Sequence, residues 1–315
     1  MLSRAANMLL ALVYSIAATI VATIAMRHLD LDGAASTGGK KHLAEARGLV
    51  TPPATGCRLA DVGGLADAKE KLRRWVLLPL RHPTVFYGSA RALRPAAGVL
   101  LHGPPGTGKT MLVRSLAAEC GVPLIALHAA ALESKWWGES PKLLAAVFAL
   151  ARTEIAPCIV FFDEVDGLGR ARSEGDQSCV YSLKCELLRN MDGLQDSTAA
   201  SVIVIGCTNC PQRLDPALRR RFQRDIHIGL PTRDDRLEIL RRLEPRGPLR
   251  RVAAATEGMS GADLAGLHSA ASLQRLGAAR VERDLAAGRI RSGEALLRSL
   301  GPLSWEHWEA ALRKR

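Results

Sequence analysis

The sequence has few aromatic residues and lacks one pattern that marks a common enzyme class. Only 4% of its 315 residues are Phe, Trp or Tyr, and the basic residues behind its net charge of +12 have no aromatics interleaved among them. That distribution indicates general arginine enrichment, so we expect no nucleic acid among the partners. The zinc-binding pattern H-E-x-x-H is absent, which excludes a zinc metalloprotease of the usual type.

The seven cysteines follow no disulfide framework, which indicates a reducing compartment. Cys207 and Cys210 form a single C-x-x-C, and no second pair completes a zinc site. With 48% apolar residues, the chain is long enough for one or two domains with a sizeable core.

A glycine-rich loop, GPPGTGKT, lies between the apolar run Gly98–His102 and the helical pattern Met111–Glu119. In this strand–loop–helix context, backbone N–H groups close around phosphate oxygens and the helix dipole favours the same anion. Lys109 is placed to reach the β- and γ-phosphates of ATP, and Thr110 to coordinate Mg²⁺. The predicted nucleotide-binding residues here are Gly103, Pro104, Pro105, Gly106, Thr107, Gly108, Lys109, Thr110 and Met111.

A second motif, IVFFDE, ends an apolar strand with two carboxylates. Ligands bind at the carboxyl end of parallel strands, so Asp163 is expected to hold Mg²⁺ through water. Glu164 is expected to polarise the attacking water, which makes the reaction a hydrolysis. For Asp166, a helix cap and a catalytic role are both open.

The N-terminal segment predicts a membrane anchor. Met8–Met26 contains 19 residues without a charge, and as a helix it spans ~28 Å, close to the hydrocarbon core of a bilayer. Arg4 precedes the run, whereas Arg27, Lys40 and Lys41 follow it, which favours a cytosolic C-terminal side. A cleaved signal peptide is the alternative. We therefore assign residues 1–28 to a transmembrane anchor and 29–57 to a linker, in which His42–Arg47 adds a short helix.

The rest of the chain alternates strand and helix patterns and then becomes helical. Strands are predicted at Gly98–His102, Leu124–Leu127, Cys158–Phe162, Val202–Gly206 and Asp225–Ile228, and helices at Lys142–Arg152, Asp234–Leu243, Gly261–Leu276 and Trp305–Arg313. This order predicts an α/β domain with a parallel sheet over residues 58–230 and a small helical domain over 231–315.

Several linked motifs carry a resemblance that runs from about Leu59 to Leu312. They are LADVGGL, GPPGTGKT, FFDE, CTN, LDPALRRRF and GMSGADL. In this order the chain resembles an AAA ATPase. The resemblance implies a P-loop α/β domain, a helical lid and a homo-hexameric ring that binds ATP and Mg²⁺ between neighbouring subunits.

The resemblance also implies roles for individual residues. Asn209 matches the sensor that positions the lytic water, and Asp61, Val62 and Gly63 match the segment that wraps the adenine. Arg220 and Arg221 match the arginine fingers that act on ATP held by the adjacent subunit, and Arg219 is an ambiguous third. A planar guanidinium suits the charge that spreads over a transferred phosphoryl group.

Lys135, Trp136, Trp137 and Gly138 match a first pore loop, whose aromatic faces would grip a polypeptide client in the channel. Local packing of the two indoles is the alternative. The second pore loop is expected near Arg170–Ser178.

Within the family, the apolar N-terminus and KWWGES are similar to the outer-membrane dislocases of mitochondria and peroxisomes, which extract mislocalised tail-anchored proteins. RRRFQRDIHIGLP is closer to microtubule-severing and ESCRT-disassembling relatives, the alternative function, and a catalytically dead scaffold is a third. Two departures stand out: Cys210 replaces the usual Arg, and Gln177 and Ser178 replace a common His-Glu. The dislocase interpretation implies a single-pass protein of the mitochondrial outer membrane or the peroxisome, with a cytosolic motor.

Overall fold

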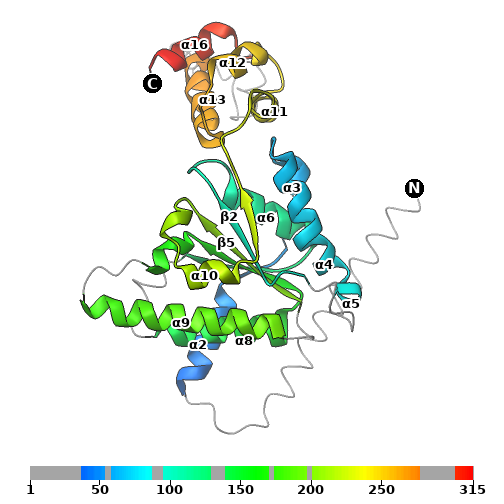
Figure 1. Cartoon of the computed structure of the whole chain (residues 1–315). Helices are drawn as coiled ribbons and strands as arrows, with labels where there is room; N and C mark the ends of the chain where they lie inside the picture. The colour runs from blue at the N-terminus through cyan, green and yellow to red at the C-terminus, as the bar shows by residue number, and fades with distance from the viewer. Residues whose placement is uncertain are drawn as a thin grey trace, which may run out of the picture.

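The computed structural model describes residues 37–53, 58–86, 95–128, 139–169, 174–196, 201–276 and 302–314 (Figure 1). Its centre is a six-stranded sheet in the order β1-β3-β4-β5-β2-β6. The strands are β1 (Val50–Thr51), β2 (Gly98–His102), β3 (Leu124–His128), β4 (Cys158–Asp163), β5 (Val202–Thr208) and β6 (Arg224–His227). All neighbours pair in parallel except β1, which joins β3 antiparallel at the edge.

The five strands predicted from apolar runs are confirmed, with ends that differ by no more than two residues. The central strands β4 and β5 are buried along almost their whole length, because helices cover both faces of the sheet. Their carboxyl ends carry Asp163 and Thr208, which therefore lie at one edge of the sheet.

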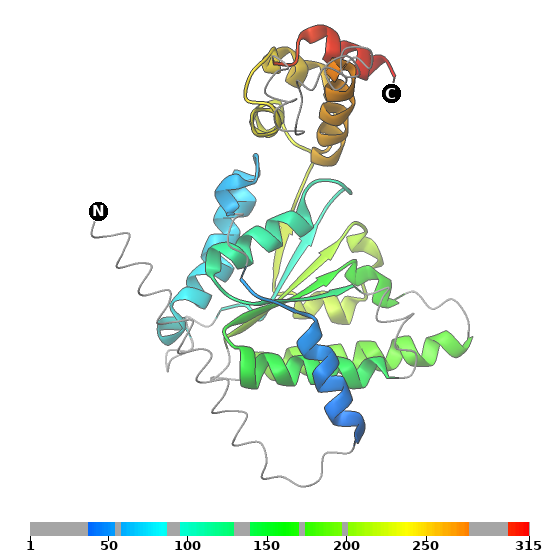
Figure 2. The ribbon, with the colours of Figure 1, turned by 180° about the vertical axis from the view of Figure 1, so that it is seen from behind.

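Helices form a layer on each face (Figures 1 and 2). One layer holds α2 (Thr37–Gly48), α8 (Ser140–Leu150), α9 (Glu174–Asp196) and α10 (Pro216–Arg221), and it packs against sheet residues such as Leu100 and Phe162. The other holds α3 (Ala66–Leu72), α4 (Leu78–Arg81) and α6 (Lys109–Cys120), and it packs against Leu101 and Phe161. The short helix α5 (Pro83–Phe86) follows α4. Successive residues of a strand thus point to opposite faces of the sheet and pack in two separate apolar cores.

A helical unit follows β6. It contains α11 (Arg233–Leu243), α12 (Leu249–Ala255), α13 (Gly261–Leu276) and α16 (Trp305–Arg313), and the described part of the chain after β6 contains no strand. Thr232 begins α11 with a capping box, in which Asp235 accepts from the backbone of Thr232. The unit has its own apolar core around the fully buried Trp308, so it packs as a second body at one end of the sheet (Figure 1).

Residues 37–51, which the sequence assigned to the linker, form α2 and the edge strand β1. Ala46 is fully buried against the core of the α8 layer. Arg47 pairs with both carboxylate oxygens of Glu154 at 3.0 and 3.1 Å, and Lys41 lies 3.1 Å from Glu139. This part of the predicted linker is therefore packed against the large domain.

The predicted membrane span, residues 8–26, lies outside the described residues. Within the described ranges, the structure has no helix that is both long and apolar enough to cross a membrane.

Candidate active site

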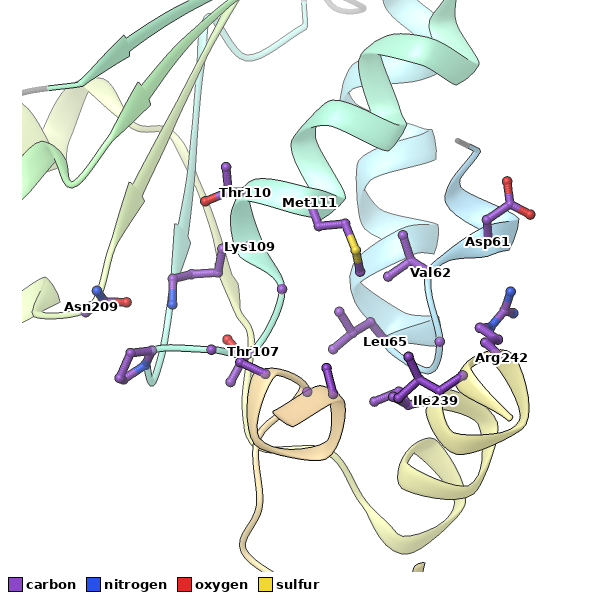
Figure 3. Close-up of a pocket in the computed structure, with 18 of the residues that line it drawn as sticks. Asp61, Val62, Leu65, Thr107, Lys109, Thr110, Met111, Asn209, Ile239 and Arg242 are labelled. Atoms are coloured by element: carbon purple, nitrogen blue, oxygen red, sulfur yellow. The ribbon is translucent and has the colours of Figure 1, made fainter. Parts of the chain in front are cut away.

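A cavity of ≈ 570 Å³ lies between the phosphate loop, the segment before α3 and the helical unit (Figure 3). It brings together residues that are as much as 204 positions apart in the sequence, because Asp61 and Ala265 both line it. The predicted site residues that line it are Asp61, Val62, Gly63, Pro105, Gly106, Thr107, Gly108, Lys109, Thr110, Met111, Asp163, Glu164 and Asn209. Gly103 and Pro104, also predicted, belong to the loop but do not line the cavity.

Two glycines let the loop fold tightly. Gly103 has a φ of +150°, and a Cβ there would lie 2.0 Å from the carbonyl oxygen of Ile228. Gly106 has a φ of +73°, and a Cβ there would lie 2.6 Å from the hydroxyl of Ser260. The carbonyl of Gly106 also accepts a 3.0 Å hydrogen bond from the N–H of Ala262. The phosphate loop therefore touches the helical unit directly, with no room for a side chain.

Lys109 is buried within the loop that it belongs to. Its Nζ donates to the carbonyl oxygens of Gly103 at 2.9 Å and Pro104 at 2.7 Å. Burial lowers the pKa of Lys109, and the neighbouring Cys207 and Asp163 oppose that shift. A cation whose hydrogen-bond partners in the described part of the chain are carbonyl oxygens is suited to receive a polyphosphate.

Thr110 and Asp163 meet at the start of α6. The hydroxyl of Thr110 donates a 2.8 Å hydrogen bond to Oδ2 of Asp163, while Oδ1 accepts from the N–H of Glu164. A hydroxyl beside a carboxylate offers the oxygen ligands that Mg²⁺ prefers, so these two residues fit the predicted metal. Glu164 itself is exposed and has a φ of +54°, an unusual backbone conformation for a residue that is not glycine.

Asp166 and Thr208 hold the loop that carries Asn209. The hydroxyl of Thr208 donates to Oδ1 of Asp166 and accepts from the N–H of Cys210 at 2.9 Å. Asp166 does not line the cavity. Its carboxylate therefore bonds the residue before Asn209, while Asn209 itself is exposed to the cavity.

The side of the cavity away from Asn209 holds a group of apolar side chains beside the charged Asp61 and Arg242, and much of it comes from residues that were not predicted. Figure 3 shows the side chains of Val62, Leu65, Met111 and Ile239 close together there. The lining residues that the sequence analysis missed are Leu65, Ile239, Arg242, Leu243, Gly261, Ala262 and Ala265. Three of these had a signal, because Leu65 ends the motif LADVGGL and Gly261 and Ala262 belong to GMSGADL. The other four are ordinary helix residues whose position in the site depends on how two bodies meet. A group of apolar side chains on one side of the cavity and the cation Lys109 on the other suit a nucleoside polyphosphate.

Arg220 and Arg221 do not line this cavity. They end α10, and Arg221 forms an ion pair with Asp192 of α9. The predicted pore-loop residues Lys135, Trp136, Trp137 and Gly138 lie outside the described residues. Of the second predicted loop, Arg170–Ser178, the structure describes only the backbone of α9 from Glu174.

The first cysteine of the C-x-x-C pair lies in β5 and the second follows that strand. Cys207 is buried, which raises the pKa of its thiol, and Cys210 is half-buried. In the described part of the chain, no group of three or more His, Cys, Asp or Glu could hold a metal ion.

Comparisons with known proteins place these features in context. Residues 99–230 match the family described as "ATPase family associated with various cellular activities (AAA)". The outer mitochondrial transmembrane helix translocase of Danio rerio is 38% identical over 257 residues, covering 80% of this chain and 67% of that protein. Spastin of Danio rerio is 43% identical over 223 residues, and fidgetin-like protein 1 of Caenorhabditis elegans 42% over 221. The spastin match covers 69% of this chain and 38% of spastin, and the fidgetin-like match covers 68% of this chain and 36% of that protein. This chain therefore spans well under half the length of these two relatives.

Among solved structures, the AAA domain of FIGL-1 in complex with ADP superposes with a TM-score of 0.72 at 32% identity. The match covers 90% of this chain and 91% of that domain, so it includes both the sheet and the helical unit.

Proposed function

The chain belongs to the AAA family of ATPases and is related both to the mitochondrial translocase and to the spastin and fidgetin group; from this premise we propose that it is a membrane-anchored protein translocase. In this proposal it uses ATP hydrolysis to extract mislocalised tail-anchored proteins from the outer membrane of mitochondria or from the peroxisome.

The observation that carries the ATPase part is the convergence of Lys109, Thr110, Asp163, Glu164 and Asn209 on one cavity. In the proposed reaction Lys109 binds the β- and γ-phosphates, and the carboxylate of Glu164 accepts a proton from the attacking water, which Asn209 orients. Thr110 and Asp163 would hold Mg²⁺, which neutralises charge on the phosphates when bound.

The proposal includes a homo-hexamer. Arg220 and Arg221 are separated from their own cavity, so they would act on ATP bound to the neighbouring subunit. Such trans contacts are worth roughly 10³–10⁵ in turnover.

The membrane part rests on the 19 uncharged residues 8–26 and on the translocase relative, whose similarity extends over 80% of this chain. The pore-loop assignment of Trp136 and Trp137 supplies the grip on a client. We propose that the motor faces the cytosol, where ATP and the client's soluble part are both available.

Glu164→Gln tests the ATPase part. The variant should bind nucleotide like the parent, because an amide of the same size leaves the phosphate contacts intact, and it should lose turnover. Equal turnover in the variant and the parent would remove Glu164 from the mechanism.

Trp136→Ala with Trp137→Ala tests translocation in liposomes that hold a labelled tail-anchored client. ATPase activity should survive within a few-fold, because neither residue is a predicted nucleotide ligand, while extraction collapses. Alkaline carbonate extraction and protease protection test the anchor and its orientation. A soluble protein, or undiminished extraction by the double variant, would contradict the translocase proposal.

A second candidate is remodelling of microtubules or ESCRT filaments. The observation in its favour is the 43% identity to spastin over 223 residues. Microtubule severing by the purified full-length protein, with no extraction from liposomes, would favour this candidate over the first.

A further inference from the structure

Helix α10 carries the two predicted arginine fingers, and both of its ends are fastened to α9. At its C-terminal end, Arg221 binds Asp192 through two parallel hydrogen bonds, Nε to Oδ1 at 2.7 Å and Nη2 to Oδ2 at 2.8 Å. Two parallel bonds between a guanidinium and a carboxylate fix orientation as well as distance. The side chains are only 30% and 46% exposed, so water competes with the pair incompletely.

The other end of α10 is held in the same way. Asp215 caps the helix by accepting from the N–H of Ala217 at 2.7 Å, and it also accepts from Nζ of Lys184 in α9 at 2.8 Å. These bonds lower the pKa of Asp215, the Lys184 contact being the largest cause. Asp215 therefore stays ionised and keeps both contacts under ordinary conditions.

The backbone between these ion pairs is fixed by packing. Leu218 is fully buried in the α8 and α9 layer, and Phe222, directly after the helix, packs over Gly206 of β5. The carbonyl oxygen of Arg221 lies so close to β2 that a Cβ on Gly98 would be 2.5 Å from it. The helix can therefore move only together with α9 and the sheet.

The three consecutive arginines differ in their partners. Arg221 is bound to Asp192, and Arg219 lies 3.3 Å from Asp225. Arg220 is exposed and, among the residues that the structure describes, has no carboxylate within ion-pair distance. Of the three guanidinium groups, Arg220 is thus the one available to an anion outside its own subunit.

We propose that Asp192 and Arg221 form a positioning pair, and that Arg220 is the arginine that reaches the ATP of the neighbouring subunit. The inference rests on the proposed function and divides its two arginine fingers into one catalytic residue and one positioning residue. The bidentate pair keeps the last turn of α10 in place, so that Arg220 projects from the subunit at a fixed position on its surface. A displacement of about 1 Å at such a group costs about 10²-fold in rate.

Exchange of the two charges separates these roles. The full-length protein, in lipid nanodiscs, is compared with Asp192→Arg, with Arg221→Asp and with the double variant that carries both changes. We expect each single variant to lose about 10²-fold in kcat with little change in KM. The double variant again has an arginine facing an aspartate, with the two positions exchanged. Its kcat should recover to within about tenfold of the parent value, because in this proposal Arg221 itself touches no nucleotide.

A second set of conservative variants keeps the inference testable if the exchanged pair does not fold. Arg221→Lys retains a cation for Asp192 and should keep kcat within about tenfold, whereas Arg220→Lys loses the planar guanidinium and should lose about 10³-fold. Arg219→Lys serves as the matched control in the same helical turn. Hexamer formation and thermal unfolding are measured for every variant.

Two results would overturn the division of roles. One is a folded, hexameric double variant as inactive as Arg221→Asp alone, and the other is an equal loss for Arg220→Lys and Arg221→Lys. Either result leaves the proposed function intact if both arginines remain essential. Full activity of both Arg220→Lys and Arg220→Ala would also overturn the division of roles. The shared site of the hexameric function would be removed only if Arg221→Ala were fully active as well.

Discussion

The hydroxyl of Thr110, in the first turn of α6, donates a 2.8 Å hydrogen bond to the carboxylate of Asp163, at the end of β4. This bond joins the phosphate loop to the neighbouring acidic strand. It means that a cation bound there would meet two oxygen ligands that are already close together, so less ordering is needed when the metal binds.

Thr110→Val should therefore lower the affinity for Mg²⁺ far more than Thr110→Ser does. Valine keeps the shape of the side chain but removes the hydroxyl, and the affinity for Mg²⁺ should fall by about 10–100-fold. Serine keeps the hydroxyl and should stay within a few-fold of the parent. The measurement is ATPase rate against Mg²⁺ concentration at fixed ATP; overlapping curves for the two variants would show that the hydroxyl is not a ligand.

Gly106→Ala should uncouple the phosphate loop from the helical unit, and Gly121→Ala provides a matched control. Both glycines have a positive φ, +73° and +72°, but a Cβ at Gly106 would lie 2.6 Å from Ser260, whereas nothing lies within 4 Å at Gly121. The control should lose about 1–2 kcal/mol of stability from backbone strain alone.

For Gly106→Ala we expect the same strain and, in addition, a loss of nucleotide affinity that the control does not show. The clash must displace Ser260 or the loop, and the loop's carbonyl is also bonded to the N–H of Ala262. Calorimetric titration with a non-hydrolysable ATP analogue measures the effect. Equal affinities for the two variants would mean that this contact does not shape the site.

The strands and the phosphate loop could be predicted because their signals are local. A run such as Cys158–Phe162 is apolar enough to be a buried strand wherever it lies, and the loop's glycines and Lys109 are adjacent in sequence. Helix α9 was not predicted, although its sequence also carries a local signal. Its buried residues Leu183, Leu187, Met191 and Leu194 recur at helical spacing.

Other features depend on contacts that no local pattern reveals. Ile239 and Arg242 line the cavity only because α11 packs beside Gly63, where a Cβ would lie 2.7 Å from Ile239. The packing of α2 was missed for a similar reason. Its sequence is polar and rich in small residues, and it is held by the buried Ala46 and His42, the half-buried Leu43 and a few ion pairs.

That packing gives a prediction about the N-terminal segment. Ala46→Glu should destabilise the large domain by several kcal/mol, because the charge would enter a fully buried position of the core. Ala44→Glu, two residues away on the exposed side of the same helix, should change stability by about 0.5 kcal/mol or less. Thermal unfolding of the two variants decides the point, since an undocked segment would tolerate both changes equally.

The helical unit should lose stability as the pH falls below neutrality. His268 packs against Trp308 with ring centroids 5.9 Å apart and lies 3.8 Å from Glu244. Burial lowers the pKa of His268 below its ordinary value of 6.5, although Glu244 opposes the shift. The unfolded chain therefore binds a proton more readily than the folded one. This contribution to stability is complete above the unfolded pKa and is lost as the pH falls through it towards the lower folded pKa.

His268→Gln should remove this contribution, because glutamine is neutral at every pH in that range. Tm should therefore fall less for the variant than for the parent between about pH 7.5 and 5.5, an interval in which histidine titrates and most carboxylates stay ionised. Burial also lowers the pKa of His102. Because His102 is present in both the parent and the variant, part of the change of Tm with pH should remain in both. His102→Gln, tested alone, measures the contribution of His102 to the change of Tm with pH. That contribution belongs to the start of the phosphate loop and not to the helical unit. An unchanged slope in His268→Gln would mean that the ring accepts a proton in place, with Glu244 compensating fully for its burial.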